Sequence, residues 1–188
     1  MFFRQVNDRK LAQYSYLIGC QATGDAIVVD PMRDVSVYHE LAAAEGLKIV
    51  ATAETHIHAD FLSGARELAE RGVTVYASAE GGPDWQSEWL KGSAYPHRLV
   101  HNGDHFMIGR LRFDVWHTPG HTPEHVCYLV TDTPAGASIP VGLLSGDFVF
   151  VGDVGRPDLL ETAAGHVGSM EPGARALYAS IQADRKSG

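Results

Sequence analysis

Three side chains that can bind a metal ion recur at every second position in one short stretch of the sequence. His56, His58 and Asp60 follow directly after the apolar run of residues 47–53 (LKIVATA). In extended backbone, side chains two positions apart point to the same side, so this spacing predicts two imidazoles and a carboxylate clustered at the end of a buried strand. Neutral imidazole suits zinc, iron and copper, and a carboxylate can complete or orient such a site.

A second histidine cluster lies in residues 117–125 (HTPGHTPEH). Two prolines and a glycine exclude regular secondary structure there, and the prolines stiffen the loop, so little entropy is lost when His121 is held in place. We therefore expect His121 to bind a metal ion. His117 and His125 are expected to be supporting or packing residues.

A carboxylate follows a third apolar run, residues 141–144, in the sequence Ser145-Gly146-Asp147. A Gly-Asp pair by itself is a common turn. Together with His121 and a histidine of the first cluster, however, Asp147 completes a set of two histidines and one carboxylate. Such a set leaves coordination positions open, as in non-haem Fe(II) oxygenases.

The elements that must position these side chains can be predicted from hydrophobic periodicity and turn residues. The pattern predicts strands over residues 14–19, 26–30, 47–53, 73–77, 105–108, 111–117, 126–131 and 141–144. It predicts helices from Asp34 to Gly46, over residues 62–71, and from Pro172 onward. Their expected inward faces carry Val37, Leu41 and Ala44 in the first; Leu62, Ala65, Leu68 and Ala69 in the second; and Ala174, Leu177, Tyr178 and Ile181 in the third. This order predicts a layered α/β domain.

The composition narrows the classes of function. The chain has 188 residues, which suits one domain, and its net charge of −8 argues against non-specific binding of nucleic acid. Two cysteines, Cys20 and Cys127, are expected to be buried thiols in a reducing compartment. The sequence lacks a run of about 18 apolar residues and a signal-peptide pattern, so a cytoplasmic protein without a membrane span is expected.

The motifs resemble a known family. The series of His56, His58 and Asp60, then Pro119-Gly120-His121, then Ser145-Gly146-Asp147 is similar to that of the metallo-β-lactamase superfamily. More narrowly, residues 54–64 (ETHIHADFLSG), 117–123 (HTPGHTP), 145–147 and 154–159 (VGRPDL) resemble the persulfide dioxygenase (sulfur dioxygenase) branch, in particular the N-terminal domain of bacterial fusions with a rhodanese domain. The resemblance spans about residues 2–181 and implies an αββα sandwich.

The resemblance also implies roles for individual residues. One Fe(II) per chain would be held by His56, His121 and Asp147, although zinc could occupy the site in purified protein. His58 and Asp60 would lie beside the metal. Arg156 would lie near the anionic thiol substrate, since a guanidinium can pair with a carboxylate; the alternative for Arg156 is a structural ion pair with Asp158.

The implied activity is the oxidation of glutathione persulfide, or a similar low-molecular-weight persulfide, by O₂ to sulfite and a thiol. The main alternative is a glyoxalase II-like zinc hydrolase of glutathione thioesters. Two-metal hydrolases of the superfamily carry a histidine directly after the aspartate of the first motif, where this chain has Phe61. A phenyl ring cannot bind a metal ion, so a second metal is not expected.

The last expectation concerns the end of the chain. The family domain continues beyond the final helix, so residues 1–188 are expected to form a metallo-β-lactamase-like domain shortened at its C-terminus and without the rhodanese domain. A third reading is therefore an inactive metal-binding fragment. The expected partners are a small persulfide and O₂, with a separate rhodanese and a homodimer as further options.

Overall fold

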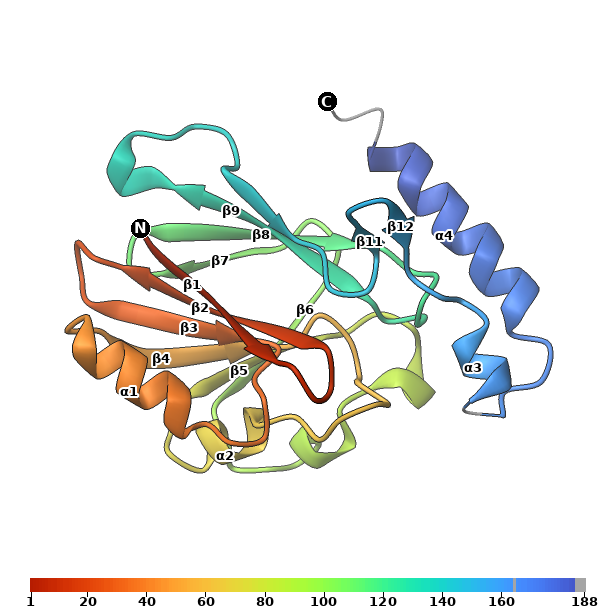
Figure 1. The fold of residues 1–188 in the computed structure, drawn as a ribbon, viewed down its shortest axis with the longest axis horizontal. Coiled ribbons are helices and arrows are strands. Elements are labelled where there is room, and N and C mark those ends of the chain that lie inside the picture. Colours follow the sequence, from red (N-terminus) through yellow and green to blue (C-terminus); the bar gives the residue numbers. More distant parts are fainter. Residues whose placement is uncertain (164, 185–188) are drawn as a thin grey trace.

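Two β-sheets lie face to face in the computed structural model, which describes residues 1–163 and 165–184 (Figure 1). The first sheet has the order β1-β2-β3-β4-β5-β6. Its strands are β1 (Phe2–Asp8), β2 (Gln13–Cys20), β3 (Asp25–Val29), β4 (Lys48–Ala53), β5 (Thr74–Ser78) and β6 (His97–Val100). β1 to β3 pair antiparallel, and β3 to β6 pair parallel.

The second sheet is antiparallel and has the order β10-β9-β8-β7. Its strands are β7 (His105–Ile108), β8 (Leu111–His117), β9 (Val126–Asp132) and β10 (Gly142–Leu144). A separate hairpin of β11 (Val149–Phe150) and β12 (Asp153–Val154) follows β10. Short 3₁₀ turns occupy Pro83–Trp85, Glu88–Leu90 and Thr133–Ala135.

The main core fills the space between the two sheets. Ile27 and Ala53 of the first sheet face Phe106, Phe113 and Tyr128 of the second, and all five are buried. The ring of Phe106 stacks on that of Phe113 with centroids 5.2 Å apart. Because side chains alternate between the two faces of a strand, the neighbouring residues of β2 and β3 are free to pack on the outer face.

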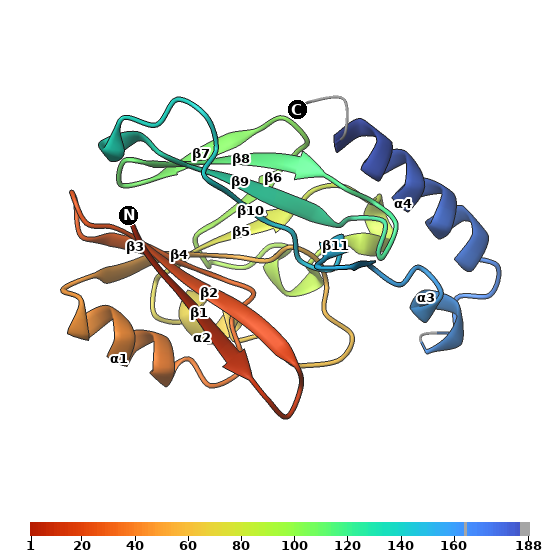
Figure 2. The same ribbon diagram turned by 45° about the horizontal axis from the view of Figure 1, so that its top comes forward.

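Helices lie on the outer face of the first sheet, and the C-terminal helix packs at one end of the second sheet (Figure 2). This arrangement agrees with the predicted αββα sandwich. α1 (Ser36–Ala44) and α2 (Ala65–Ala69) pack on the first sheet, where Tyr38 and Leu68 are fully buried. α3 (Leu159–Thr162) precedes α4 (Met170–Asp184), whose Leu177 packs beside the second sheet, against Cys127 and Phe148.

The predicted strands are confirmed to within two residues at each end. The predicted hairpin turn at residues 109–110 is also confirmed, because Ile108 pairs with Leu111. The predicted second helix is wrong in its first part. Residues 56–64 form an irregular loop and α2 begins only at Ala65, which leaves Leu62 68% exposed. Gly64 lies so close to the carbonyl of Met32 that a side chain could not fit there.

Two predicted helix faces also need correction. In α1, Tyr38 and Ala42 are buried and Ala44 is exposed. In α4, Leu177 faces inward, but Tyr178 is 65% exposed and Ala174 is also exposed. In both helices, the apolar residues expected to face inward cover a wider arc of the helix than the residues that are buried.

Cys20 and Cys127 are both buried and form no disulfide, as expected. Among the described residues, no helix is long and apolar enough to cross a membrane.

Candidate metal centre

Three loops that each follow a strand meet at one end of the sandwich. They are residues 54–64 after β4, residues 118–125 after β8, and residues 145–148 after β10. Figure 2 shows β8, β9 and β10 side by side. β8 and β10 run toward the end of the molecule where α3 and α4 lie, and the antiparallel β9 begins there. The strands thus deliver side chains from distant parts of the sequence to one place.

His56, His121 and Asp147 come together there. One possible ligand atom from each lies within 4.8 Å of the others. His121 Nε2 is 3.4 Å from Asp147 Oδ2, and the His56 and His121 rings meet edge to face with centroids 4.9 Å apart. Two imidazole nitrogens and a carboxylate suit iron or zinc, so these residues fit the metal expected from the sequence.

Hydrogen bonds fix which nitrogen of His56 is free. The Thr55 hydroxyl donates to Asp30 Oδ2 at 2.8 Å, because a carboxylate can only accept. The same hydroxyl lies 3.0 Å from His56 Nδ1, which must therefore donate to it. The lone pair of His56 is then on Nε2, and the Asp30–Thr55 pair orients the ring in the way that carboxylates orient metal-binding histidines.

His121 is oriented by the backbone. Its Nδ1 donates to the carbonyl of Arg156 at 3.1 Å, so Nε2 carries the lone pair and lies beside Asp147. Burial raises the pKa of Asp147, although the neighbouring His121 opposes the shift. Burial, followed by the charges of neighbouring histidines, lowers the pKa of His56 well below its usual value. Both shifts describe the metal-free site, and a bound cation would favour the ionised carboxylate.

His58 belongs to a different cluster. Its Nε2 lies 3.2 Å from Asp30 Oδ1 and 3.2 Å from Glu54 Oε2. Burial disfavours charge on this ring, but the two carboxylates outweigh burial and raise the pKa of His58 to about 10. His58, Asp30 and Glu54 could also hold a cation, but a protonated His58 would itself place a positive charge 3.2 Å from an oxygen of each carboxylate.

Phe61 occupies the position where a histidine would follow the first motif. Its ring centroid is 4.3 Å from that of His58, so it fills space beside the site without offering a ligand atom. Asp60 is exposed and lines a cleft of about 430 Å³. His56, Asp147 and Tyr14 line the same cleft.

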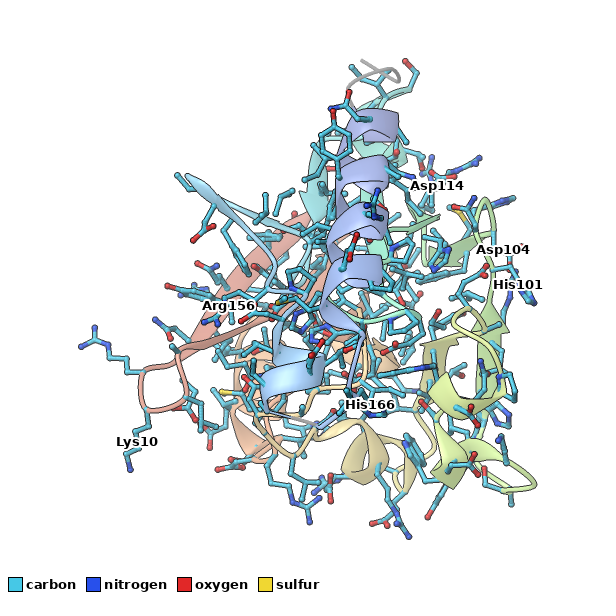
Figure 3. The ribbon with its side chains drawn as sticks, turned by 90° about the vertical axis from the view of Figure 1, so that its right-hand side faces the viewer. Lys10, His101, Asp104, Asp114, Arg156 and His166 are labelled. Carbon is cyan, nitrogen blue, oxygen red and sulfur yellow. The ribbon has the colours of Figure 1, made fainter. Side chains whose placement is uncertain are left out.

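Arg156 extends into solvent on the side of the molecule that also carries the β1–β2 loop with Lys10 (Figure 3). Its side chain is 64% exposed and holds Asp158 with two hydrogen bonds, of 3.0 and 2.5 Å. The structure thus contains the ion pair with Asp158 that was the alternative role for Arg156. The carbonyl of Arg156, rather than its guanidinium, contacts His121.

The sequence analysis missed three acidic residues of this region: Asp30, Glu54 and Glu124. Asp30 ends an apolar strand, as Asp147 does, and this shared pattern is the signal that could have revealed it. Glu54 lies two residues before His56 in the motif already identified. Glu124 is 1% exposed, which nothing in its local sequence indicates.

A family model described as the metallo-beta-lactamase superfamily matches residues 8–185. The chain belongs to this superfamily. Among curated relatives, it is 27% identical over 172 residues to the mitochondrial persulfide dioxygenase ETHE1 of Bos taurus, covering 87% of this chain and 59% of the relative. It is 29% identical over 148 residues to a hydroxyacylglutathione hydrolase of Francisella tularensis subsp. novicida, covering 79% and 52%. The chain thus spans between half and three fifths of the length of these two relatives.

Solved structures show the same superfamily fold. A metallo-beta-lactamase from Staphylococcus aureus subsp. aureus COL is 45% identical with a TM-score of 0.89, over 98% of this chain and 52% of that one. ETHE1 from Myxococcus xanthus is 29% identical with a TM-score of 0.71, over 97% and 68%. TTHA1623 in a di-iron-bound form is 28% identical with a TM-score of 0.64, over 95% and 84%.

Proposed function

We propose that this protein is a mononuclear iron-dependent persulfide dioxygenase that oxidises glutathione persulfide or a similar small persulfide. The observation that carries the proposal is the gathering of His56 Nε2, His121 Nε2 and the Asp147 carboxylate at an open cleft. Phe61 supports one metal rather than two, because a second ion would lack a ligand at that position. The similarity to persulfide dioxygenases supports the choice of substrate.

The reaction balances as RSSH + O₂ + H₂O → RSH + H₂SO₃. The outer sulfur loses four electrons and O₂ gains four, so no other oxidant is needed. When bound, iron supplies the redox chemistry of this exchange, and the protein supplies placement and charge. A persulfide whose sulfur reaches Asp147 would extend its organic part along the cleft, which has the volume of a typical small-molecule site.

The protein side chains would contribute charge and orientation. The protonated His58 gives the cleft one fixed positive charge among Asp30, Asp60 and Asp147. Asp60, which lines the cleft, would accept a hydrogen bond from the substrate or from water. Arg156 would attract an anionic thiol only if it exchanged part of its pairing with Asp158, which its exposure allows. We propose a cytoplasmic location, consistent with Cys20 and Cys127 being buried thiols that are not joined in a disulfide.

A zinc-dependent thioester hydrolase is the second candidate. The similarity to the Francisella hydrolase favours it, and so does the suitability of two histidines and a carboxylate for zinc. A protein with this function would hydrolyse a glutathione thioester and would consume no oxygen. The absence of a ligand atom on Phe61 weighs against a two-metal version of this mechanism.

The test is an oxygen-electrode assay of the chain, loaded anaerobically with Fe(II), using glutathione persulfide. We expect one O₂ to be consumed for each sulfite released, as the balanced reaction requires. His121→Ala and Asp147→Ala should lower the rate by on the order of 100-fold or more, because even residues behind metal ligands matter at the 10- to 100-fold level. His105→Ala, at an exposed histidine on β7, is the matched control and should keep the rate. Hydrolysis of a glutathione thioester without oxygen uptake would contradict the proposal.

A further inference from the structure

Glu124 and His125 are two consecutive buried polar residues at the end of the His121 loop. Their relative exposures are 1% and 0%. Neither belongs to the proposed ligand set. Each side chain accepts a hydrogen bond from a backbone N–H in another loop that carries a proposed ligand. Together they link the segments of His56, His121 and Asp147.

Glu124 attaches the His56 segment. Its Oε1 accepts the N–H of Ile57, the residue after His56, at 2.8 Å. Two positions further along, the N–H of Val126 donates to the carbonyl of Thr55, the residue before His56, at 2.8 Å. The backbone on both sides of His56 is therefore fixed to the beginning of β9.

His125 attaches the Asp147 segment. Its Nε2 accepts the N–H of Asp147 at 3.0 Å. Since Nε2 accepts, the ring proton lies on Nδ1, which donates to Thr118 Oγ1 at 2.8 Å. The N–H of Thr118 in turn donates to the carbonyl of His125 at 2.9 Å, which closes the loop around His121.

The contact with Asp147 is possible because of Gly146. A Cβ atom at this position would lie 2.8 Å from His125 Nε2 and would also collide with Thr55 Oγ1. Gly146 has a φ of +48°, in the left-handed region that glycine tolerates. The turn thus presses the backbone of Asp147 onto His125 and directs its carboxylate toward the two histidines.

Burying a carboxyl group and an imidazole costs free energy unless their polar atoms are hydrogen-bonded. One oxygen of Glu124, Oε2, has no hydrogen-bond partner among the described residues. An apolar pair of similar size would fill the same space without this cost, although it would leave the N–H groups of Ile57 and Asp147 unpaired.

We propose that Glu124 and His125 form a positioning clamp that sets the relative placement of His56, His121 and Asp147 and thereby the metal affinity of the site. The proposal rests on the metal site described above but not on which reaction the metal supports. Both clamp residues act through backbone amides, and the His125 ring also stacks on the His56 ring with centroids 5.1 Å apart, so they are positioning residues rather than catalytic ones.

Two pairs of variants test the clamp. His125→Phe and Glu124→Leu keep most of the volume and remove the acceptor. His125→Gln and Glu124→Gln keep an acceptor oxygen near the position of the lost atom. His105→Phe, at an exposed histidine, is the control. For each protein, the dissociation constants of Zn²⁺ and, anaerobically, Fe(II) are measured by competition with a chromogenic chelator, and the thermal midpoint of the metal-free form is recorded.

We expect His125→Phe and Glu124→Leu to bind either metal about 10- to 100-fold more weakly, the range found for residues behind metal ligands. The two glutamine variants should regain most of that affinity at an unchanged thermal midpoint. If His125→Phe does not fold, the metal affinities of Glu124→Leu and Glu124→Gln are compared in the same way. Unchanged affinity in the apolar variants, or an equal loss in the glutamine variants, would overturn the clamp alone. Wild-type protein that binds neither metal would overturn the metal site and the clamp together.

Discussion

At the residue scale, the candidate site depends on which nitrogen of each histidine is free. His56 and His121 both use Nδ1 as a donor, to Thr55 and to the Arg156 carbonyl, so both present Nε2 to Asp147. His58 differs because two carboxylates surround it and keep it protonated. The same side-chain type is thus suited either to a neutral ligand or to a cation, depending on what its ring nitrogens contact.

The raised pKa of His58 predicts a pH-dependent stability of the metal-free protein. The pKa of His58 in the folded protein is about 10, against an ordinary value of 6.5. The folded state binds the His58 proton more tightly than the unfolded state does. The resulting stabilisation of the folded protein should therefore be complete below about pH 6.5 and should be lost as the pH rises toward 10. Urea unfolding of wild type and His58→Gln at pH 6, 8 and 9.5 measures this difference.

We expect His58→Gln to be less stable by on the order of 3 kcal/mol at pH 6, because it leaves Asp30 and Glu54 buried without their cation. The difference between the two proteins should shrink toward pH 9.5. His97→Gln, which replaces an exposed histidine on β6, is the control. A difference that does not depend on pH would contradict a protonated His58.

At the element scale, the site is built where strands end. The sequence was sufficient to predict β4, β8 and β10 and their polar loops, because a short apolar run precedes each cluster. It did not reveal that Asp30, at the end of β3, lies beside His58, since this contact depends on the pairing of β3 with β4. Nor did it predict that residues 56–64 would remain irregular.

The β1–β2 loop and the first residues of β2 line one side of the cleft. This placement predicts an effect of Tyr14, on β2, on substrate binding. Tyr14 lines the cleft with 50% of its surface exposed. Tyr14→Ala should raise the KM for glutathione persulfide about fivefold, equivalent to roughly 1 kcal/mol of aromatic contact, and leave kcat nearly unchanged. Steady-state oxygen uptake measures both constants. Tyr178→Ala, at an exposed tyrosine on α4, is the control, and a fall in kcat without a change in KM would argue against a binding role.

At the scale of the whole molecule, the αββα sandwich brings together residues that are up to 91 positions apart in the sequence, from His56 to Asp147. The fold class and the three-residue set could be predicted from the sequence, because motif order and strand pattern agree. Glu124 could not, because its importance depends on burial and on a bond to Ile57, 67 positions away. Local pattern and the family resemblance thus predicted which candidate ligand residues would meet, while the contacts that hold them required the assembled fold.

The most direct test of this account is a crystal structure of the chain loaded anaerobically with Fe(II), with the metal located by anomalous scattering. We predict one iron per chain, bound to His56 Nε2, His121 Nε2 and the Asp147 carboxylate, with His58 still between Asp30 and Glu54. Two metal ions per chain, or a single ion held by Asp30, Glu54 and His58, would contradict the account.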